Sequence, residues 1–149
     1  MEKDESVHGT CVALGDRAAL LRGAPGSGKS DLALRFLTMF AMDDGSGCAR
    51  LVADDQTRLG VAGGKLLAHA PSATKGLLEV RGLGIIQVEA LAEAELALVV
   101  DLTGADDIER LPGPDSLTTI LGISLPLLRL AAFEASAPVK LKVALGGKL

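Results

Sequence analysis

The stretch that decides the fold is Gly23-Ala24-Pro25-Gly26-Ser27-Gly28-Lys29-Ser30, which fits the pattern G-x-x-x-x-G-K-[ST]. Glycines in such a loop let backbone N–H groups wrap around phosphate oxygens, and the N-terminus of a following helix adds positive potential. Lys29 would reach the β- and γ-phosphates, and the Ser30 hydroxyl would ligate Mg²⁺. The motif therefore predicts a nucleotide-binding domain, but it leaves the reaction open.

Apolar patterning on both sides of this loop predicts alternating strands and helices. The expected strands cover residues 7–14, 18–21, 51–53, 58–61, 66–68, 77–80, 96–102 and 118–123. The expected helices cover residues 30–42 and 125–135, whereas residues 139–145 show no assignable pattern. With a strand before the phosphate loop and a helix after it, the 149 residues are expected to form a single α/β domain over residues 1–149.

The composition excludes several classes of function. A net charge of −4 leaves no basic surplus for a phosphate backbone or an anionic lipid surface, so we expect no nucleic acid and no membrane as partner. The N-terminal residues lack the apolar core of a signal peptide, and the longest apolar runs are too short to span a bilayer. Cys11 and Cys48 show neither metal-ligand spacing nor a disulfide framework. These features predict a cytoplasmic protein.

Aromatic residues are scarce, with three phenylalanines and neither Trp nor Tyr. A bound base would therefore have only Phe36, Phe40 and Phe133 available for stacking. We expect the phosphates to carry most of the affinity for a nucleotide and the discrimination between bases to be weak.

Two acidic segments could supply the carboxylate that usually works with a phosphate loop and its Mg²⁺. Asp101 ends the apolar run Leu96-Ala97-Leu98-Val99-Val100 and is the better match to a hydrophobic strand followed by an acid. The pair Asp54-Asp55 ends the shorter run Leu51-Val52-Ala53. Adjacent strand residues point to opposite faces, so only one member of the pair is expected to face the nucleotide.

The order of the motifs resembles the catalytic domain of HPr kinase/phosphorylase, which phosphorylates a serine of the phosphocarrier HPr. The resemblance begins at His8-Gly9 and continues through the phosphate loop and Asp54-Asp55. It extends through Leu78-Glu79-Val80-Arg81-Gly82-Leu83-Gly84-Ile85, which is similar to the family signature E-[IVL]-R-G-[LI]-G, and through Glu109-Arg110-Leu111. It implies a P-loop kinase domain of the HPr kinase and phosphoenolpyruvate carboxykinase-like type.

The resemblance also implies roles for individual residues, with ATP and Mg²⁺ as cofactors. Lys29 would bridge the β- and γ-phosphates, while Ser30 and Glu79 would hold Mg²⁺. Asp55, beside Asp54, would take the proton from the substrate serine, although the sequence alone does not decide which of the two is the base. His8 would lie near that carboxylate and the γ-phosphate. Arg110 would stabilise charge on the transferred phosphoryl group.

Three departures from the family pattern refine this expectation. Asp31 follows the loop where the family often has Glu, and residues 126–131 read Pro-Leu-Leu-Arg-Leu-Ala without the Gly-Arg-Asn linked to phosphorylase activity. The resemblance therefore does not extend to the phosphorylase activity. The chain resembles a short form lacking the N-terminal domain, and the hexamers of the family suggest a homo-oligomer.

Two alternatives are also compatible with the sequence. One is a regulatory ATP-binding module that has lost the transfer activity, because residues 126–131 are altered. The other is a small-molecule kinase or a hydrolytic P-loop ATPase that uses Asp101.

Overall fold

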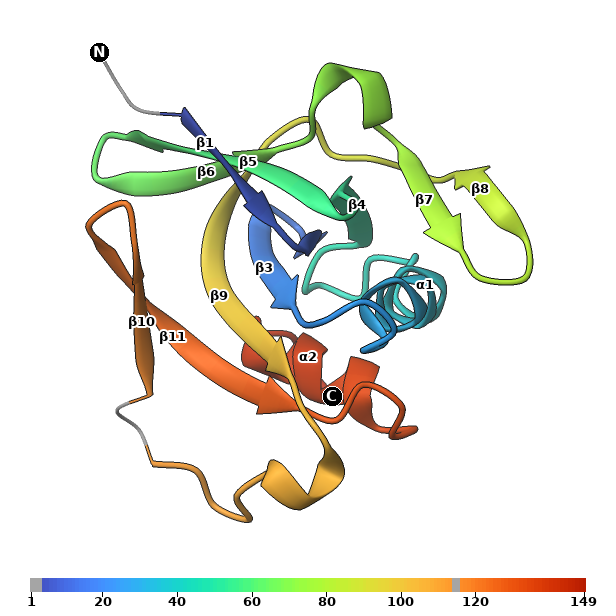
Figure 1. Ribbon diagram of the computed structural model, residues 1–149, viewed down its shortest axis with the longest axis vertical. Coiled ribbons are helices and arrows are strands. Elements are labelled where there is room, and N and C mark those ends of the chain that lie inside the picture. Colours follow the sequence, from blue (N-terminus) through green and yellow to red (C-terminus); the bar gives the residue numbers. More distant parts are fainter. Residues whose placement is uncertain (1–3, 114–115) are drawn as a thin grey trace.

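A computed structural model describes residues 4–113 and 116–149 and shows a curled β-sheet with two helices against one of its faces (Figure 1). The helices are α1 (Lys29–Met39) and α2 (Ala137–Ala144), with short 3₁₀ turns η1 (Ser72–Thr74) and η2 (Ala105–Asp107). The strands are β1 (Asp4–His8), β2 (Thr10–Leu14), β3 (Arg17–Arg22), β4 (Ala49–Ala53), β5 (Gln56–Ala62), β6 (Lys65–His69), β7 (Leu77–Val80), β8 (Gly84–Gln87), β9 (Ala94–Leu102), β10 (Leu117–Ile120) and β11 (Ile123–Leu130).

Within the described residues, nine strands form the main sheet, and β9 is its central member. The order is β1-β5-β6-β9-β3-β2-β4, and β11 also pairs with β9 and carries β10 at its outer side. Strands β3 and β11 both run parallel to β9, whereas β6 pairs with it antiparallel. The carboxyl ends of β3, β9 and β11 therefore lie at one edge, where open α/β sheets bind their ligands.

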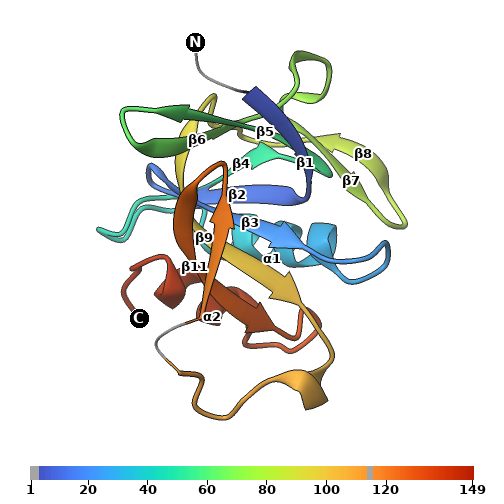
Figure 2. The ribbon, with the colours of Figure 1, turned by 60° about the vertical axis from the view of Figure 1, so that its left-hand side comes forward.

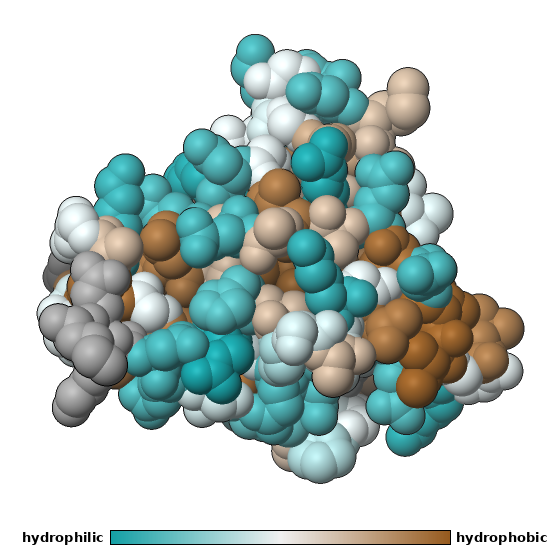
Figure 3. Space-filling view, turned by 90° about the horizontal axis from the view of Figure 1, so that it is seen from above, coloured by the Kyte–Doolittle hydropathy of each residue, from teal (hydrophilic) through white to brown (hydrophobic). Residues whose placement is uncertain are grey.

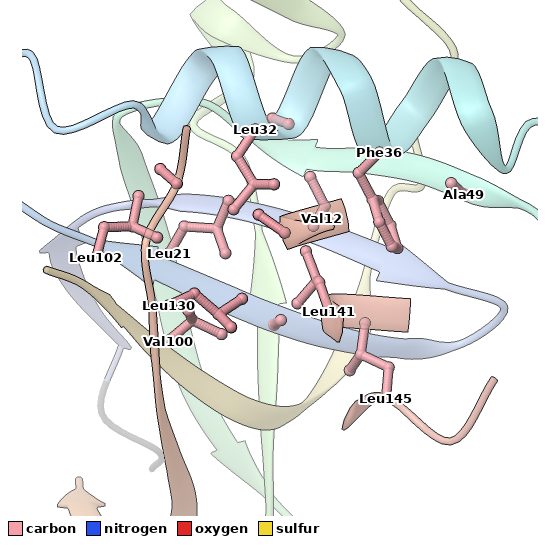
Figure 4. Close-up of a cluster of buried hydrophobic side chains, with 14 of the residues drawn as sticks. Val12, Leu21, Leu32, Phe36, Ala49, Val100, Leu102, Leu130, Leu141 and Leu145 are labelled. Atoms are coloured by element: carbon pink, nitrogen blue, oxygen red, sulfur yellow. The ribbon is translucent and has the colours of Figure 1, made fainter. Parts of the chain in front are cut away.

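The two helices bury the first of two apolar clusters, which lies between them and the sheet (Figure 4). Leu32 and Phe36 point from α1 toward the sheet, and Leu141 reaches it from α2. All three side chains are fully buried. Each fully buried Leu or Phe side chain stabilises the fold by about 1.5–3 kcal/mol, so this layer anchors the phosphate-binding helix to β3 and β9.

The second apolar cluster fills the opposite face and lies inside the curl of the sheet. Leu20 of β3 and Val99 of β9 face it, and β5, β6 and β11 cover them with Leu59, Leu66 and Leu125. Figure 2 shows β10 and β11 folding along one side of this curl while β5 and β6 lie above it. Both faces of β3 and β9 are thus buried, which explains their nearly continuous apolar sequences.

The expected α/β class is confirmed, and most expected strands are present, but the segment 7–14 is not one strand. It divides at Gly9 into β1, which pairs with β5, and β2, which pairs with β3 and β4. A side chain at Gly9 would meet Leu20 Cδ1 at 2.8 Å and the Leu21 carbonyl oxygen at 2.9 Å. This close approach needs glycine and turns the chain between the two pairings.

The predicted helix at residues 125–135 is wrong. Residues 123–130 form β11, whose Leu127 to Leu130 lie in register with Val99 to Leu102 of β9. Pairing beside the central strand overrides the helix-forming tendency of this leucine-rich segment, since propensity is a weak determinant against tertiary context. The second helix is instead α2, in the region that the sequence pattern left unassigned, and α1 ends at Met39 rather than at residue 42.

No helix in residues 4–113 and 116–149 is long and apolar enough to cross a membrane.

Candidate functional site

The phosphate loop connects the end of β3 to the start of α1, as the sequence motif predicts. Gly26 and Gly28 have positive φ angles of 83° and 100°, a conformation that L side chains rarely adopt. The Lys29 ammonium donates to the carbonyl oxygens of Gly23 and Ala24, at 2.7 and 3.3 Å. The loop thus presents the N-terminus of α1 and one largely buried cation to a phosphate group.

Asp54 lies next to this loop and binds three different elements. Its Oδ1 accepts hydrogen bonds from the hydroxyls of Thr10, at 3.0 Å, and Ser30, at 3.3 Å. Its Oδ2 accepts the backbone N–H of Glu79, at 2.9 Å. Asp54 therefore connects the first turn of α1 with β2 and β7.

Asp55 has a different environment. Its φ of 66° places it in the left-handed region, and its backbone is held by the Thr10 hydroxyl, which accepts its N–H at 3.2 Å, and by the Gly9 N–H, which donates to its carbonyl oxygen at 2.8 Å. The carboxylate is 62% exposed, and its Oδ1 lies 3.6 Å from His8 Nε2. The left-handed backbone conformation is uncommon outside glycine and is kept here by these two hydrogen bonds.

The two neighbouring aspartates thus have different surroundings. Asp54 has both oxygens engaged beside the phosphate loop, whereas Asp55 presents an exposed carboxylate next to the His8 imidazole. Asp54 is the member of the pair that contacts the first turn of α1, and which of the two faces a nucleotide stays a prediction.

Thr10 is a site residue that the sequence analysis did not identify. It is completely buried, and its single hydroxyl both donates to Asp54 and accepts from the Asp55 backbone. The available signal was its position as the one polar residue at the start of the otherwise apolar run Thr10-Cys11-Val12-Ala13-Leu14.

Glu79 lies on the short β7–β8 ribbon, and its side chain is exposed. Its main chain contacts Asp54, so the ribbon is attached to the site, while its carboxylate remains accessible. Leu83 and Ile85 in the same ribbon are 73% and 69% exposed, and Figure 3 shows apolar residues gathered on the side where Figure 1 places β7 and β8. Ser30 and Glu79, the two predicted magnesium ligands, are linked through Asp54, which accepts hydrogen bonds from the Ser30 hydroxyl and the Glu79 backbone N–H.

Asp101, the alternative acid, is engaged elsewhere. Its two oxygens accept hydrogen bonds from the Arg22 guanidinium at 2.7 and 3.1 Å, and Arg129 is its register partner on β11. A carboxylate held by a bidentate guanidinium is a poor candidate for a metal ligand or a base. The alternative that uses Asp101 is not favoured.

Arg110 is exposed and follows η2. In the part of the chain that the structure describes, no hydrogen bond or ion pair joins it to the phosphate loop or to the aspartate pair. Its predicted role remains a prediction from the family pattern.

The remaining candidates for site chemistry are few. Within residues 4–113 and 116–149, no group of three or more His, Cys, Asp or Glu side chains could hold a metal ion. Magnesium is usually held by one or two carboxylates together with phosphate oxygens and water. The Ser30 hydroxyl and the Asp54 and Glu79 carboxylates are the oxygen groups that this part of the chain could offer to a metal that arrives with a nucleotide. Burial raises the pKa of the Cys11 thiol, which keeps it protonated and unreactive at neutral pH.

Comparison with known proteins gives one consistent result. Residues 1–140 match the family model described as the HPr Serine kinase C-terminal domain. HPr kinase/phosphorylase of Bordetella pertussis is 34% identical over 131 residues, which cover 80% of this chain and 40% of that protein. The protein of the same name from Clostridium beijerinckii is 33% identical, covering 82% of this chain and 41% of its own length. The chain thus spans about two fifths of the length of these curated relatives.

A solved structure shares the fold. The Hpr(Ser) kinase/phosphatase of Coxiella burnetii superposes with a TM-score of 0.77 and 22% identity, covering 93% of this chain and 87% of that one. This likeness of fold agrees with the family match over residues 1–140. This chain belongs to the HPr serine kinase C-terminal domain family.

Proposed function

We propose that this chain is a single catalytic domain that transfers a phosphoryl group from Mg-ATP to a serine of an HPr-like phosphocarrier of the phosphotransferase system, in the cytoplasm. The observation that carries the proposal is the different placement of the two aspartates: Asp54 is hydrogen-bonded to Ser30 beside the phosphate loop, whereas Asp55 is exposed next to His8. Relatives that are about one third identical carry the name HPr kinase/phosphorylase, which supports the same substrate class.

The residues that would hold the nucleotide are those of the loop 23–30. Backbone N–H groups and Lys29 would bind the phosphates, while Ser30 and Glu79 would provide oxygen ligands to Mg²⁺ with Asp54 fixing their relative positions. When bound, Mg-ATP would supply the phosphoryl group that the serine oxygen receives, with ADP as the leaving group. Charge on that group would be offset by Lys29, and by Arg110 as in the family pattern.

Asp55 would act as the base. Its exposed carboxylate can reach the hydroxyl of a serine presented from outside, and it would accept the hydroxyl proton as the serine oxygen forms its bond to phosphorus. His8, at 3.6 Å, would orient this carboxylate. A carboxylate is a weak base for such a proton, so the contribution depends on positioning, which the backbone hydrogen bonds of Asp55 support.

Incubation with ATP, Mg²⁺ and HPr tests this proposal. Mass spectrometry should find phosphoserine on HPr, and HPr whose acceptor serine is replaced by alanine should remain unmodified. A folded protein that binds ATP but transfers nothing to HPr would contradict the proposal and favour a regulatory binding module.

A further inference from the structure

Of the three aromatic rings in the sequence, one is placed at the phosphate loop. Phe36 is fully buried in the cluster under α1, and Phe40 packs edge-on against it with ring centroids 5.4 Å apart. Phe133, in contrast, is 70% exposed. It lies in the segment 131–136, which follows β11.

This segment lies directly on the start of α1. A side-chain carbon added to Gly28 would meet Ala132 Cβ at 2.7 Å and Phe133 Cζ at 3.0 Å. Since Gly28 caps the N-terminus of α1, the tip of the Phe133 ring borders the phosphate-binding backbone. Strands β3 and β11 both end at the same edge of the sheet, so the loops that follow them are neighbours there.

Arg35 of α1 holds the segment in place. Its guanidinium donates to the carbonyl oxygens of Ala132 and Glu134, the latter at 3.2 Å, and also binds Asp31 one turn earlier. Two of these bonds fix the backbone on either side of Phe133, and the third, to Asp31, holds the guanidinium on α1. The exposed ring is therefore presented by a tethered loop.

We propose that Phe133 is the platform on which the base of the nucleotide stacks, with its phosphates in the loop 23–30. This inference rests on the proposed function and adds the base-binding residue to it. An exposed aromatic ring bordering a phosphate site offers a flat apolar face, and every nucleobase has a π-face that can stack on it. Stacking of this kind tolerates all bases, so ATP and GTP should bind with similar affinity.

Comparing the affinity for ATP and GTP, which carry a base, with the affinity for inorganic tripolyphosphate, which has none, separates base stacking from phosphate binding. Stacking on one aromatic side chain corresponds to a loss of about 5- to 150-fold in affinity upon substitution by alanine. Phe133→Ala should therefore weaken ATP and GTP by a factor in this range while leaving inorganic tripolyphosphate unchanged. Phe133→Leu should fall in between. Met42→Ala, which removes another exposed apolar side chain beyond the far end of α1, should change neither ligand.

The absence of Trp and Tyr gives a direct optical test. In Phe133→Trp the new indole is the only one in the protein, and its fluorescence should be quenched by ATP but not by tripolyphosphate. Equal affinity of Phe133→Ala and wild type for ATP, or an equal loss for ATP and tripolyphosphate, would overturn the inference. So would loss of transfer to HPr with unchanged ATP binding, since that would assign the ring to the protein substrate. If the wild-type protein bound neither ATP nor tripolyphosphate, the proposed function itself would fail.

Discussion

At the scale of single residues, the site depends on one hydroxyl. The buried Thr10 hydroxyl contacts both Asp54 and Asp55. It donates a hydrogen bond to the Asp54 carboxylate and accepts one from the Asp55 backbone N–H. Both aspartates are therefore placed by the same group, and a change there should affect the two together.

Thr10→Val should destabilise the protein and impair transfer. Valine has nearly the same shape but leaves the Asp55 N–H without its acceptor and leaves Asp54 Oδ1 with the Ser30 hydroxyl alone. The expected cost is about 1–3 kcal/mol in the free energy of unfolding. Urea unfolding measures this loss. Thr10→Ser keeps the hydroxyl and should retain most of the stability and activity; if Val and Ser behaved alike, the hydroxyl would have no such role.

Much of this site could be predicted from residue types alone. The glycines, Lys29 and Ser30 follow a pattern whose chemistry is local, so sequence suffices to place them. The hydrogen bonds of Asp54 with the Thr10 hydroxyl and the Glu79 backbone join β2 and β7 to the turn after β4. Such long-range hydrogen bonds leave no periodic signal in the sequence.

At the scale of elements, the segments around the phosphate loop agree with their apolar patterns, and the C-terminal quarter does not. Residues 125–130 carry a leucine-rich pattern that fits a helix and a strand equally well, because short apolar runs are ambiguous. Pairing with β9 decides the outcome. The real helix, α2, escaped the sequence analysis because most of its residues alternate only weakly, yet Leu141 is completely buried against α1.

Leu141→Ala should therefore lower the free energy of unfolding by about 2–5 kcal/mol, as expected for truncating a buried leucine. Val143→Ala on the same helix is the matched control, because that side chain is 46% exposed and should cost much less. Thermal and urea unfolding give both values. Equal effects of the two substitutions would show that α2 does not belong to the core.

At the scale of the whole molecule, an ion pair links two distant segments of this acidic protein. Lys142 of α2, largely buried and 4.8 Å from the centre of the Phe40 ring, donates to the Asp44 carboxylate at 2.6 Å. This hydrogen bond, together with those from Ser46, lowers the pKa of Asp44 to about 2. The pair holds the loop after α1 against the C-terminal helix.

The lowered pKa gives this link a defined pH dependence. Asp44 stabilises the folded state above its unfolded pKa of about 4, and this contribution is lost as the pH falls through about 2. Asp44→Asn should therefore be less stable than wild type at neutral pH, and the difference should shrink between pH ~4 and pH ~2. Urea unfolding at several pH values measures this. The exposed Asp106→Asn should follow wild type throughout, and a difference for Asp44→Asn that stays constant with pH would contradict the assignment.

The central claim is that Asp55 is the base of a phosphoryl transfer to serine, and a matched pair of variants tests it most directly. Single-turnover transfer from Mg-ATP to HPr should fall about 10²- to 10⁴-fold in Asp55→Asn while the affinity for ATP is unchanged. Asp101→Asn, folded to the same extent, should keep transfer near the wild-type rate. Transfer that survives in Asp55→Asn but disappears in Asp101→Asn would contradict the account.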